Sequence, residues 1–160
     1  MGIRAINLIL NTFCVFAARA LPRERFFLWL RTILKRYPYW ASGHLKFAEI
    51  ALSSNSIAEA YGAAQAVKQL SKNSRLRARA DLILGRCCLA RSSPQQAILY
   101  FKEAGNTLGS CPEVIEDLAA AYMACHDYSE AKKLLEAIDP ERLSFSGHAA
   151  LKFLDTKLKS

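Results

Sequence analysis

The sequence contains few glycine and proline residues, which break helices, and no alternating pattern of the kind that forms strands. It has 7 glycines and 5 prolines among 160 residues, and no stretch alternates apolar with polar residues as a β-strand does. Hydrophobic residues make up 52% of the chain, which excludes an intrinsically disordered protein. The composition therefore predicts one globular, helical domain.

Cysteine and histidine are too few and too scattered for a disulfide framework or a zinc site. The five cysteines are odd in number and form no Cys-x-x-Cys pair, and the three histidines share no ligand spacing. We therefore expect no metal, no cofactor, and small buried cysteines in a reducing compartment. The sequence also lacks a glycine-rich phosphate loop and a Ser–His or Cys–His arrangement, so it predicts a protein that is not an enzyme.

Acidic residues are nearly absent from the first quarter of the chain. Residues 1–46 hold eight basic side chains and one acid, Glu24, so most of the formal net charge of +8 lies there. A second basic stretch covers residues 68–91, which hold seven cations and a single acid, Asp81. From Lys102 onward, acids outnumber bases. Such segregation creates surface fields that select partners and accelerate encounter.

A helix–turn–helix pattern that begins near Ala78 and ends near Cys111 recurs on both sides of itself. In each copy a large–small pair precedes a polar break, and small residues follow at intervals of one and two turns, which lets two antiparallel helices pack closely. The three copies are Phe47-Ala48, Ala51, Asn55-Ser56, Ala60, Ala64 and Val67; Leu84-Gly85, Cys88, Ser92-Ser93-Pro94, Ala97, Phe101 and Ala104; and Leu118-Ala119, Tyr122, His126-Asp127, Ala131, Leu135 and Ile138.

This pattern resembles the tetratricopeptide repeat (TPR) family, whose unit is about 34 residues. The resemblance implies an all-α, right-handed TPR-like solenoid of helical hairpins, with about four helix pairs and a C-terminal capping helix. Its expected parts are a divergent N-terminal pair at 1–40, three repeats at 41–74, 78–111 and 112–140, and the cap at 143–160. The first pair diverges because Phe26 occupies a position that the family gives to a small residue.

Helical periodicity and the breaks at proline, glycine, serine and asparagine predict nine helices. Their expected bounds are 3–20, 23–37, 41–53, 56–71, 75–91, 94–107, 112–125, 128–138 and 145–158. Ser144 is the expected N-cap of the last helix. There Leu151, Leu154 and Leu158 form an apolar stripe with charged residues elsewhere, which is typical of a solubilising cap.

The first helix is apolar on nearly every side. Only Arg4, Asn7 and Asn11 form a narrow polar stripe, so the helix must be buried on most sides, whereas the next helix can cover only one. Four interpretations are open: a transmembrane helix, a secretory signal, a face that docks on another protein, and a helix that lies in a bilayer surface. The uncharged run at 5–18 is shorter than the roughly 20 residues of a span, and its fit to the repeat register argues against a signal.

The segment that follows interleaves cations with aromatic residues over 23–40, which suits the headgroup region of an anionic membrane. The alternative is that its apolar residues are core and its cations a solvated face. The residues predicted to contact a membrane or a docking partner are Ile6, Leu10, Phe13, Phe16, Arg23, Arg25, Phe27, Trp29 and Arg31.

The family resemblance also implies a concave groove lined by the first helix of each pair. Carried onto this chain, the positions that would bind a partner are Lys46, Glu49, Arg79, Leu82, Arg86, Glu113, Glu116 and Asp117. One TPR subclass binds the C-terminal carboxylate of chaperones with a set of Lys, Arg and Asn. That set is absent here, because Leu45 and Glu49, or Leu82 and Arg86, stand where it needs Lys and Asn, so we do not expect chaperone-tail binding. The alternative is that the groove charges only solubilise the inner face, or pair with one another, as Arg86 with Asp117.

The sequence thus predicts a non-catalytic protein–protein interaction scaffold, namely an adaptor, assembly factor or accessory subunit, docked by its N-terminal helices to a membrane surface or membrane protein complex. The expected partners are proteins, such as subunits of that complex, and an anionic membrane surface, with no small-molecule substrate. The expected location is cytoplasmic, at most peripheral on the cytoplasmic face of a membrane.

The alternative function is that of a soluble cytosolic adaptor or regulator, which binds acidic peptides or nucleic acid through the basic face of residues 75–91. Nucleic acid is the less favoured ligand, because the basic excess is split between two segments and matches no known reader motif.

Overall fold

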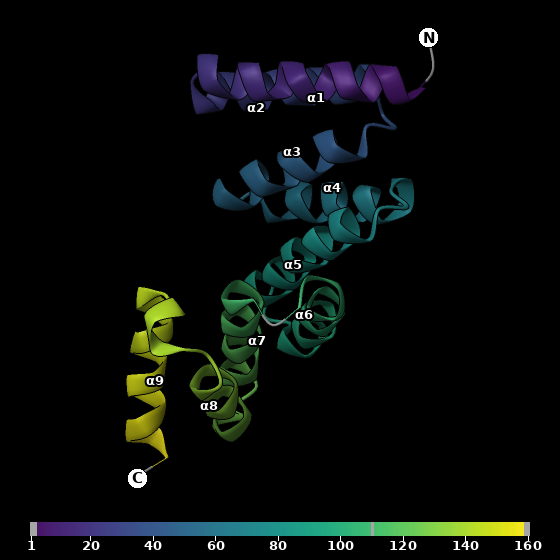
Figure 1. Cartoon of the computed structure of the whole chain (residues 1–160). Coiled ribbons are helices and arrows are strands. Elements are labelled where there is room, and N and C mark those ends of the chain that lie inside the picture. The colour runs from purple at the N-terminus through teal and green to yellow at the C-terminus, as the bar shows by residue number, and fades with distance from the viewer. Residues whose placement is uncertain (1–2, 110, 159–160) are drawn as a thin grey trace. The chain divides into compact units, whose positions relative to one another are not determined.

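A computed structural model describes residues 3–109 and 111–158, in which every regular element is a helix (Figure 1). The helices are α1 Ile3–Ala20, α2 Arg23–Arg36, α3 Ala41–Ser53, α4 Ile57–Leu70, α5 Ser74–Ala90, α6 Pro94–Leu108, α7 Pro112–Ala124, α8 Tyr128–Glu136 and α9 Phe145–Lys157, with a 3₁₀ turn at Pro140–Arg142. The all-α prediction is confirmed, and each helix ends within two residues of its expected bound. The Arg4 side chain, part of the predicted polar stripe, lies outside the described part.

Three of the turns between helices share one backbone geometry. Asn55, Ser92 and His126 adopt left-handed conformations, with φ of 58°, 56° and 62°. In each turn the next residue donates its N–H to a carbonyl five positions earlier, over 2.8, 2.9 and 2.9 Å. This is the Schellman arrangement, which satisfies the last carbonyls of the preceding helix. The turn between α1 and α2 has no such residue and instead passes through Pro22, so the first pair is built differently.

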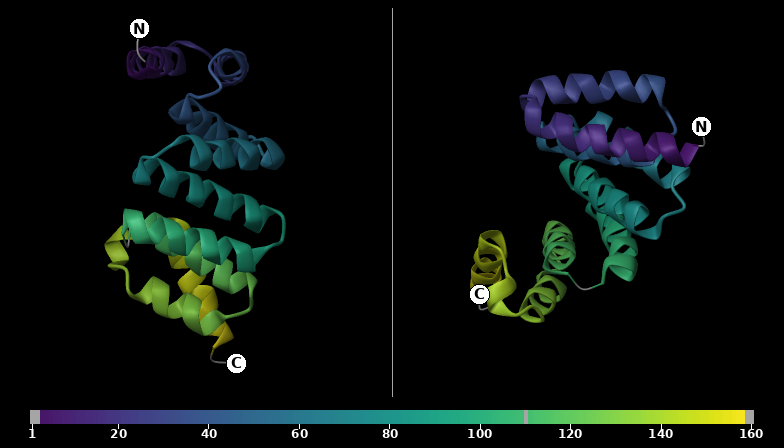
Figure 2. Two further views of the ribbon diagram at one scale, coloured as in Figure 1. Left: turned by 90° about the vertical axis from the view of Figure 1, so that its right-hand side faces the viewer. Right: turned by 45° about the horizontal axis from the view of Figure 1, so that its top comes forward.

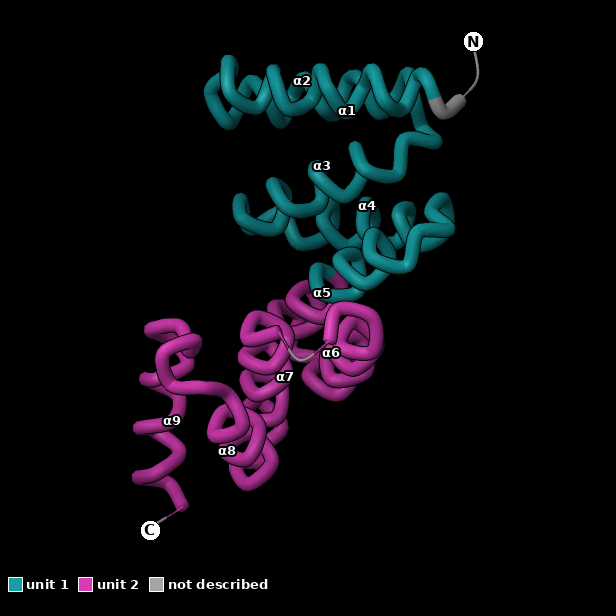
Figure 3. The backbone as a smooth tube through the Cα atoms, viewed as in Figure 1, with its two compact units in different colours: residues 1–83 teal, residues 84–160 magenta. Residues whose placement is uncertain are grey.

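The chain forms two compact units, residues 1–83 and residues 84–160, and the boundary falls within α5 (Figure 3). Unit 1 holds α1 to α4 and the first part of α5. Its core includes Leu30, Trp40, Ala64 and Val67, all buried. Unit 2 holds the rest of α5 and α6 to α9, and Leu135 and Leu154 are buried among its last helices.

The small residues of the repeat pattern lie where two helices come closest. Within unit 2, the ring of Phe101 on α6 covers Gly85 on α5, and a Cβ atom at Gly85 would lie 2.4 Å from that ring. Phe101 is fully buried together with Ala97 and Ala104, at intervals of about one turn. The glycine therefore sets how near α6 can approach α5.

The last helix buries only part of its predicted stripe. Ser144 caps α9 as expected, because its side chain accepts a hydrogen bond of 3.1 Å from the Gly147 N–H. Leu154 is buried, but Leu158 is exposed, which corrects the prediction of a three-leucine stripe. Phe145 and Phe153 are also exposed, so the outer side of this helix is less polar than expected of a cap.

The cysteines are free and behave as small core residues. Cys14, Cys87 and Cys88 are buried, whereas Cys111 and Cys125 are half-buried. Burial raises the pKa of the Cys87 thiol to about 11. The Cys87 thiol therefore stays protonated at neutral pH and packs as an apolar group.

We expect Gly85→Ala to destabilise the protein although alanine is the better helix former. The added methyl group must displace the buried Phe101 ring, and overpacking of this kind costs about 1–3 kcal/mol. The matched control is Gly62→Ala in α4, where no atom lies within 4 Å of the new Cβ and helix propensity should add up to about 1 kcal/mol of stability. Urea unfolding followed by circular dichroism measures both, and equal effects of the two substitutions would contradict the close approach.

Candidate functional site

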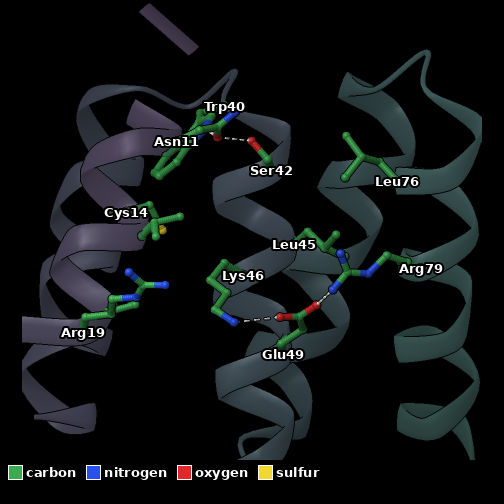
Figure 4. A pocket seen from close by; sticks show the side chains of 12 residues that line it. Asn11, Cys14, Arg19, Trp40, Ser42, Leu45, Lys46, Glu49, Leu76 and Arg79 are labelled. Carbon is green, nitrogen blue, oxygen red and sulfur yellow. Dashed lines mark hydrogen bonds and ion pairs between the residues drawn. The ribbon is translucent and has the colours of Figure 1, made fainter. Parts of the chain in front are cut away.

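A candidate site in unit 1 is a hollow between α1, α3 and α5 (Figure 4). Its volume is about 410 Å³. The residues that line it are Asn11, Cys14, Val15, Ala18, Arg19, Trp40, Ser42, Leu45, Lys46, Glu49, Leu76 and Arg79. Three of the predicted groove residues, Lys46, Glu49 and Arg79, thus share one site.

At one end of the hollow, Asn11 fastens α1 to the start of α3. Its Oδ1 accepts hydrogen bonds from Trp40 Nε1 over 2.8 Å and from Ser42 Oγ over 2.7 Å (Figure 4). The Trp40 side chain is buried, and its N–H would be costly to leave without an acceptor. The sequence places Asn11 on a polar stripe but does not indicate this role, because only the packing of Trp40 reveals it.

At the other end, three cations and a single carboxylate line the hollow. Glu49 accepts a hydrogen bond of 3.2 Å from Lys46 on its own helix and a second from Arg79 on α5. Arg19 extends from α1 into the same space (Figure 4), and it makes no ion pair with any residue that the structure describes. This end of the hollow therefore carries an excess of positive charge.

Between the two ends the lining is apolar. Cys14 and Leu45 are buried, and Val15, Ala18 and Leu76 contribute aliphatic surface. Burial raises the pKa of the Cys14 thiol, opposed by nearby Lys46 and aided by Glu49, so the sulfur remains a neutral Sγ–H group. The hollow thus combines an apolar floor with a cationic end, which suits a ligand that carries an apolar group beside an anion.

The remaining predicted groove residues are engaged within the protein. Arg86 donates hydrogen bonds of 2.8 Å to Asp117 and of 2.8 Å to Glu113, which confirms the alternative that these charges pair. Glu116 accepts a hydrogen bond of 2.7 Å from the backbone N–H of Ser144, at the start of α9. Leu82 is buried and cannot contact a partner, which corrects its assignment to the groove surface.

The basic stretch at 68–91 is also partly neutralised. Lys68 lies 2.6 Å from the buried carboxylate of Asp81, Arg79 pairs with Glu49, and Arg86 pairs with two acids. A nucleic acid would have to compete with each of these partners. The distribution of ion pairs therefore gives no support to nucleic-acid binding at residues 75–91.

The predicted docking residues divide into exposed and packed ones. Phe13 and Phe16 on α1 are 61% and 72% exposed, and Arg23, Arg25 and Arg31 also lie at the surface. By contrast, Leu10 is only 8% exposed and belongs to the core, which removes it from the set.

The remaining members of that set are partly covered. Phe27 stacks on Phe47 with ring centroids 4.6 Å apart, and Ile6 and Trp29 are half-buried. The prediction missed Leu8, which is 69% exposed. Among the helices as described, none is both long and apolar enough to cross a bilayer.

Comparison with known proteins finds likeness in structure but not in sequence. No family model and no curated protein matches the chain. A solved structure of MamA from Desulfovibrio magneticus RS-1, comprising residue 41 to the end, aligns with a TM-score of 0.78 at 14% identity, over 99% of this chain and 88% of that one. Two other MamA crystal structures align at TM-scores of 0.73 and 0.71, each at 16% identity, over 86% and 96% of this chain and 79% and 88% of theirs.

The chain has a TPR-like fold of helical hairpins. At 14–16% identity the likeness is one of fold, and the site residues above come from this chain alone. Within residues 3–109 and 111–158, no group of three or more His, Cys, Asp or Glu side chains is placed to hold a metal ion.

We expect Arg86→Met to destabilise the fold by about 1–3 kcal/mol, because it leaves the largely buried Asp117 carboxylate without its partner. Asp117→Asn in the same chain should recover part of that loss, and a double-mutant cycle measures the coupling. The control is Arg77→Met, an exposed cation of α5 without an ion pair among the described residues. Equal losses from both methionine variants would contradict the assigned role of Arg86.

The loss caused by Arg86→Met should also depend on pH. Burial already raises the pKa of Asp117, and Arg86 is the main influence that lowers it. Without Arg86 the folded-state pKa lies further above the unfolded value, so between those values the folded state binds more protons than the unfolded one. Stability of the variant relative to wild type should therefore rise as the pH falls from 7 towards 4, and chemical denaturation at several pH values tests this.

Proposed function

We propose that the protein is a non-catalytic protein–protein interaction scaffold that holds an acidic segment of a partner in the hollow of unit 1. In this role it serves as an adaptor, assembly factor or accessory subunit. The exposed apolar side of α1 docks it on a membrane surface or on a protein complex in a membrane. The observation that carries the proposal is that Arg19, Lys46 and Arg79 line one hollow with a single carboxylate, Glu49, which pairs with Lys46 and Arg79.

The charge of this cluster favours a carboxylate ligand. Glu49 can neutralise only one of the three cations, and Arg19 has no described ion-pair partner. A planar guanidinium matches a carboxylate with two parallel hydrogen bonds, so Arg19 and Arg79 are suited to an aspartate or glutamate side chain or a chain terminus.

The shape of the hollow favours a segment of a protein over an isolated ion. A volume of about 410 Å³ is in the usual range for ligand sites and exceeds what one carboxylate fills. The apolar floor at Cys14, Leu45 and Leu76 offers room for an aliphatic side chain next to the acid. Successive hairpins of a repeat protein present such surfaces along their first helices, which supports a peptide as the ligand.

The proposal predicts that the full-length chain binds a peptide of alternating Leu and Asp more tightly than one of alternating Leu and Lys. Fluorescence anisotropy of labelled peptides measures both affinities. Arg79→Gln should weaken binding of the acidic peptide about tenfold or more, because it removes one charge-assisted contact and leaves Glu49 less neutralised.

The matched control is Arg75→Gln, which makes the same change of charge on the same helix but outside the lining of the hollow. It should leave the affinity nearly unchanged. Equal losses from the two variants would reduce the effect to bulk charge, and equal binding of both peptides would refute an acidic ligand.

A further inference from the structure

The outer side of α1 is a continuous apolar face that nothing in the described structure covers. α1 packs on α2 and α3 through the side that holds Leu10 and Cys14, and Figure 2 shows α1 and α2 as neighbouring helices. The opposite side, here called the α1 outer face, consists of Leu8, Ile9, Thr12, Phe13 and Phe16. Its four apolar side chains are between 44% and 72% exposed.

The one polar group of the α1 outer face is already satisfied. The Thr12 hydroxyl donates a hydrogen bond of 3.0 Å to the Leu8 carbonyl one turn earlier. On α2, Thr32 bonds in the same way to the carbonyl of the exposed Leu28. This back-bonding to the helix is how hydroxyl groups are satisfied where water is absent. The face can thus enter an apolar phase without leaving a donor unpaired.

Both helices of the N-terminal pair carry exposed cations without ion-pair partners. Arg19 is on the last turn of α1, and Arg25, Lys35 and Arg36 are exposed on α2; none of the four has an ion-pair partner among the described residues. The only acid in residues 1–46 is Glu24. A row of exposed apolar side chains bordered by cations is the pattern of helices that lie in the surface of an anionic membrane.

The same charges disfavour a second copy of the chain as the occupant. A symmetric dimer would bring identical basic regions together, because a two-fold interface pairs a patch with itself. Like charges facing each other across an interface repel. The acyl chains and acidic headgroups of a bilayer, by contrast, complement both the apolar and the basic parts of this surface.

We propose that α1 lies in the plane of an anionic bilayer, with Leu8, Phe13 and Phe16 among the acyl chains and the neighbouring cations at the headgroups. This rests on the docking part of the proposed function and names lipid as what α1 contacts. The 18-residue helix lies along the surface and does not cross it, consistent with its length and its uncharged run.

Flotation of the full-length chain with lipid vesicles tests this proposal. We expect binding to phosphatidylcholine vesicles that contain phosphatidylserine, and binding weaker by about tenfold or more on pure phosphatidylcholine. Raising the salt from about 0.1 M to about 1 M should also weaken it, since the screening length falls from about 10 Å to about 3 Å.

The decisive variant is Phe13→Glu/Phe16→Glu, which should lower the partition onto anionic vesicles by more than about tenfold. Its matched control is Leu99→Glu/Phe145→Glu, which makes the same charge change at positions of unit 2 that are 65% and 92% exposed. Circular dichroism and acidic-peptide binding should be unchanged in both variants.

In addition, Phe16→Trp should show a blue shift of tryptophan emission on anionic vesicles only.

Several results would overturn the proposal. These are equal binding to neutral and anionic vesicles, equal losses from the two glutamate pairs, or self-association that depends on Phe13 and Phe16 without vesicle binding. Failure of the acidic peptide to bind, with vesicle binding intact, would reject the hollow as a ligand site and leave this inference standing. Binding of the acidic peptide without binding to anionic vesicles would reject the lipid contact alone.

Discussion

The repeat hairpins depend on a close approach of their two helices, which requires a small residue where a large one packs against it. In unit 2 the Phe101 ring lies where a Cβ atom of residue 85 would be, so glycine is required there. The left-handed turns at Asn55, Ser92 and His126 return the chain at the angle that such packing needs. Given the small–large contact and the left-handed turn, a hairpin buries the sides of its helices that face each other. Its other apolar sides are buried only if the next helix along the chain covers them.

That dependence explains why the N-terminal pair differs from the rest. α1 has α2 and α3 as neighbours, and no described helix precedes it to cover its far side. The apolar residues at that side, Leu8 and Phe16 among them, stay exposed, whereas Leu10 and Cys14 become core. An exposed aromatic face of this kind is costly in water, at about 1.5–3 kcal/mol for each large side chain that could be buried. The cost is offset if the face meets a non-aqueous partner.

The helices could be predicted from the sequence because local signals fix them. Pro94 and Pro112 stand in first turns, Ser144 caps α9, and polar residues break the chain at each turn. The choice between Leu10 and Phe13 could not be predicted, since both are apolar and only packing against the next helices distinguishes them. The repeat register did anticipate the Arg86–Asp117 pair, because the two residues occupy neighbouring positions on successive first helices.

The hollow was only partly predictable, because only the packing of the helices against one another brings some of its residues together. Lys46, Glu49 and Arg79 belong to regular repeat positions, so the family resemblance identified them. Arg19 and Asn11 belong to the divergent first pair, where the register gives no guidance. Their place in the site follows from the way α1 rests on α3, which is fixed by the hydrogen bond from Trp40 to Asn11. Asn11, a polar residue on a mainly apolar helix, is therefore a structural contact although its side chain is exposed.

The position of Arg19 links the two proposed surfaces. It lines the hollow, yet on α1 it follows Thr12 by seven residues, or about two helical turns, and so lies on the same side as the α1 outer face. A carboxylate in the hollow that pairs with Arg19 neutralises its charge, so the attraction between this guanidinium and an anionic lipid headgroup falls. A ligand that takes Arg19 would therefore weaken the attachment of α1 to an anionic bilayer, and by linkage the bilayer would weaken the ligand to the same extent. The hydrogen bonds of Asn11 to Trp40 and Ser42 do not involve Arg19, so the competition is confined to this one cation and need not move the helix.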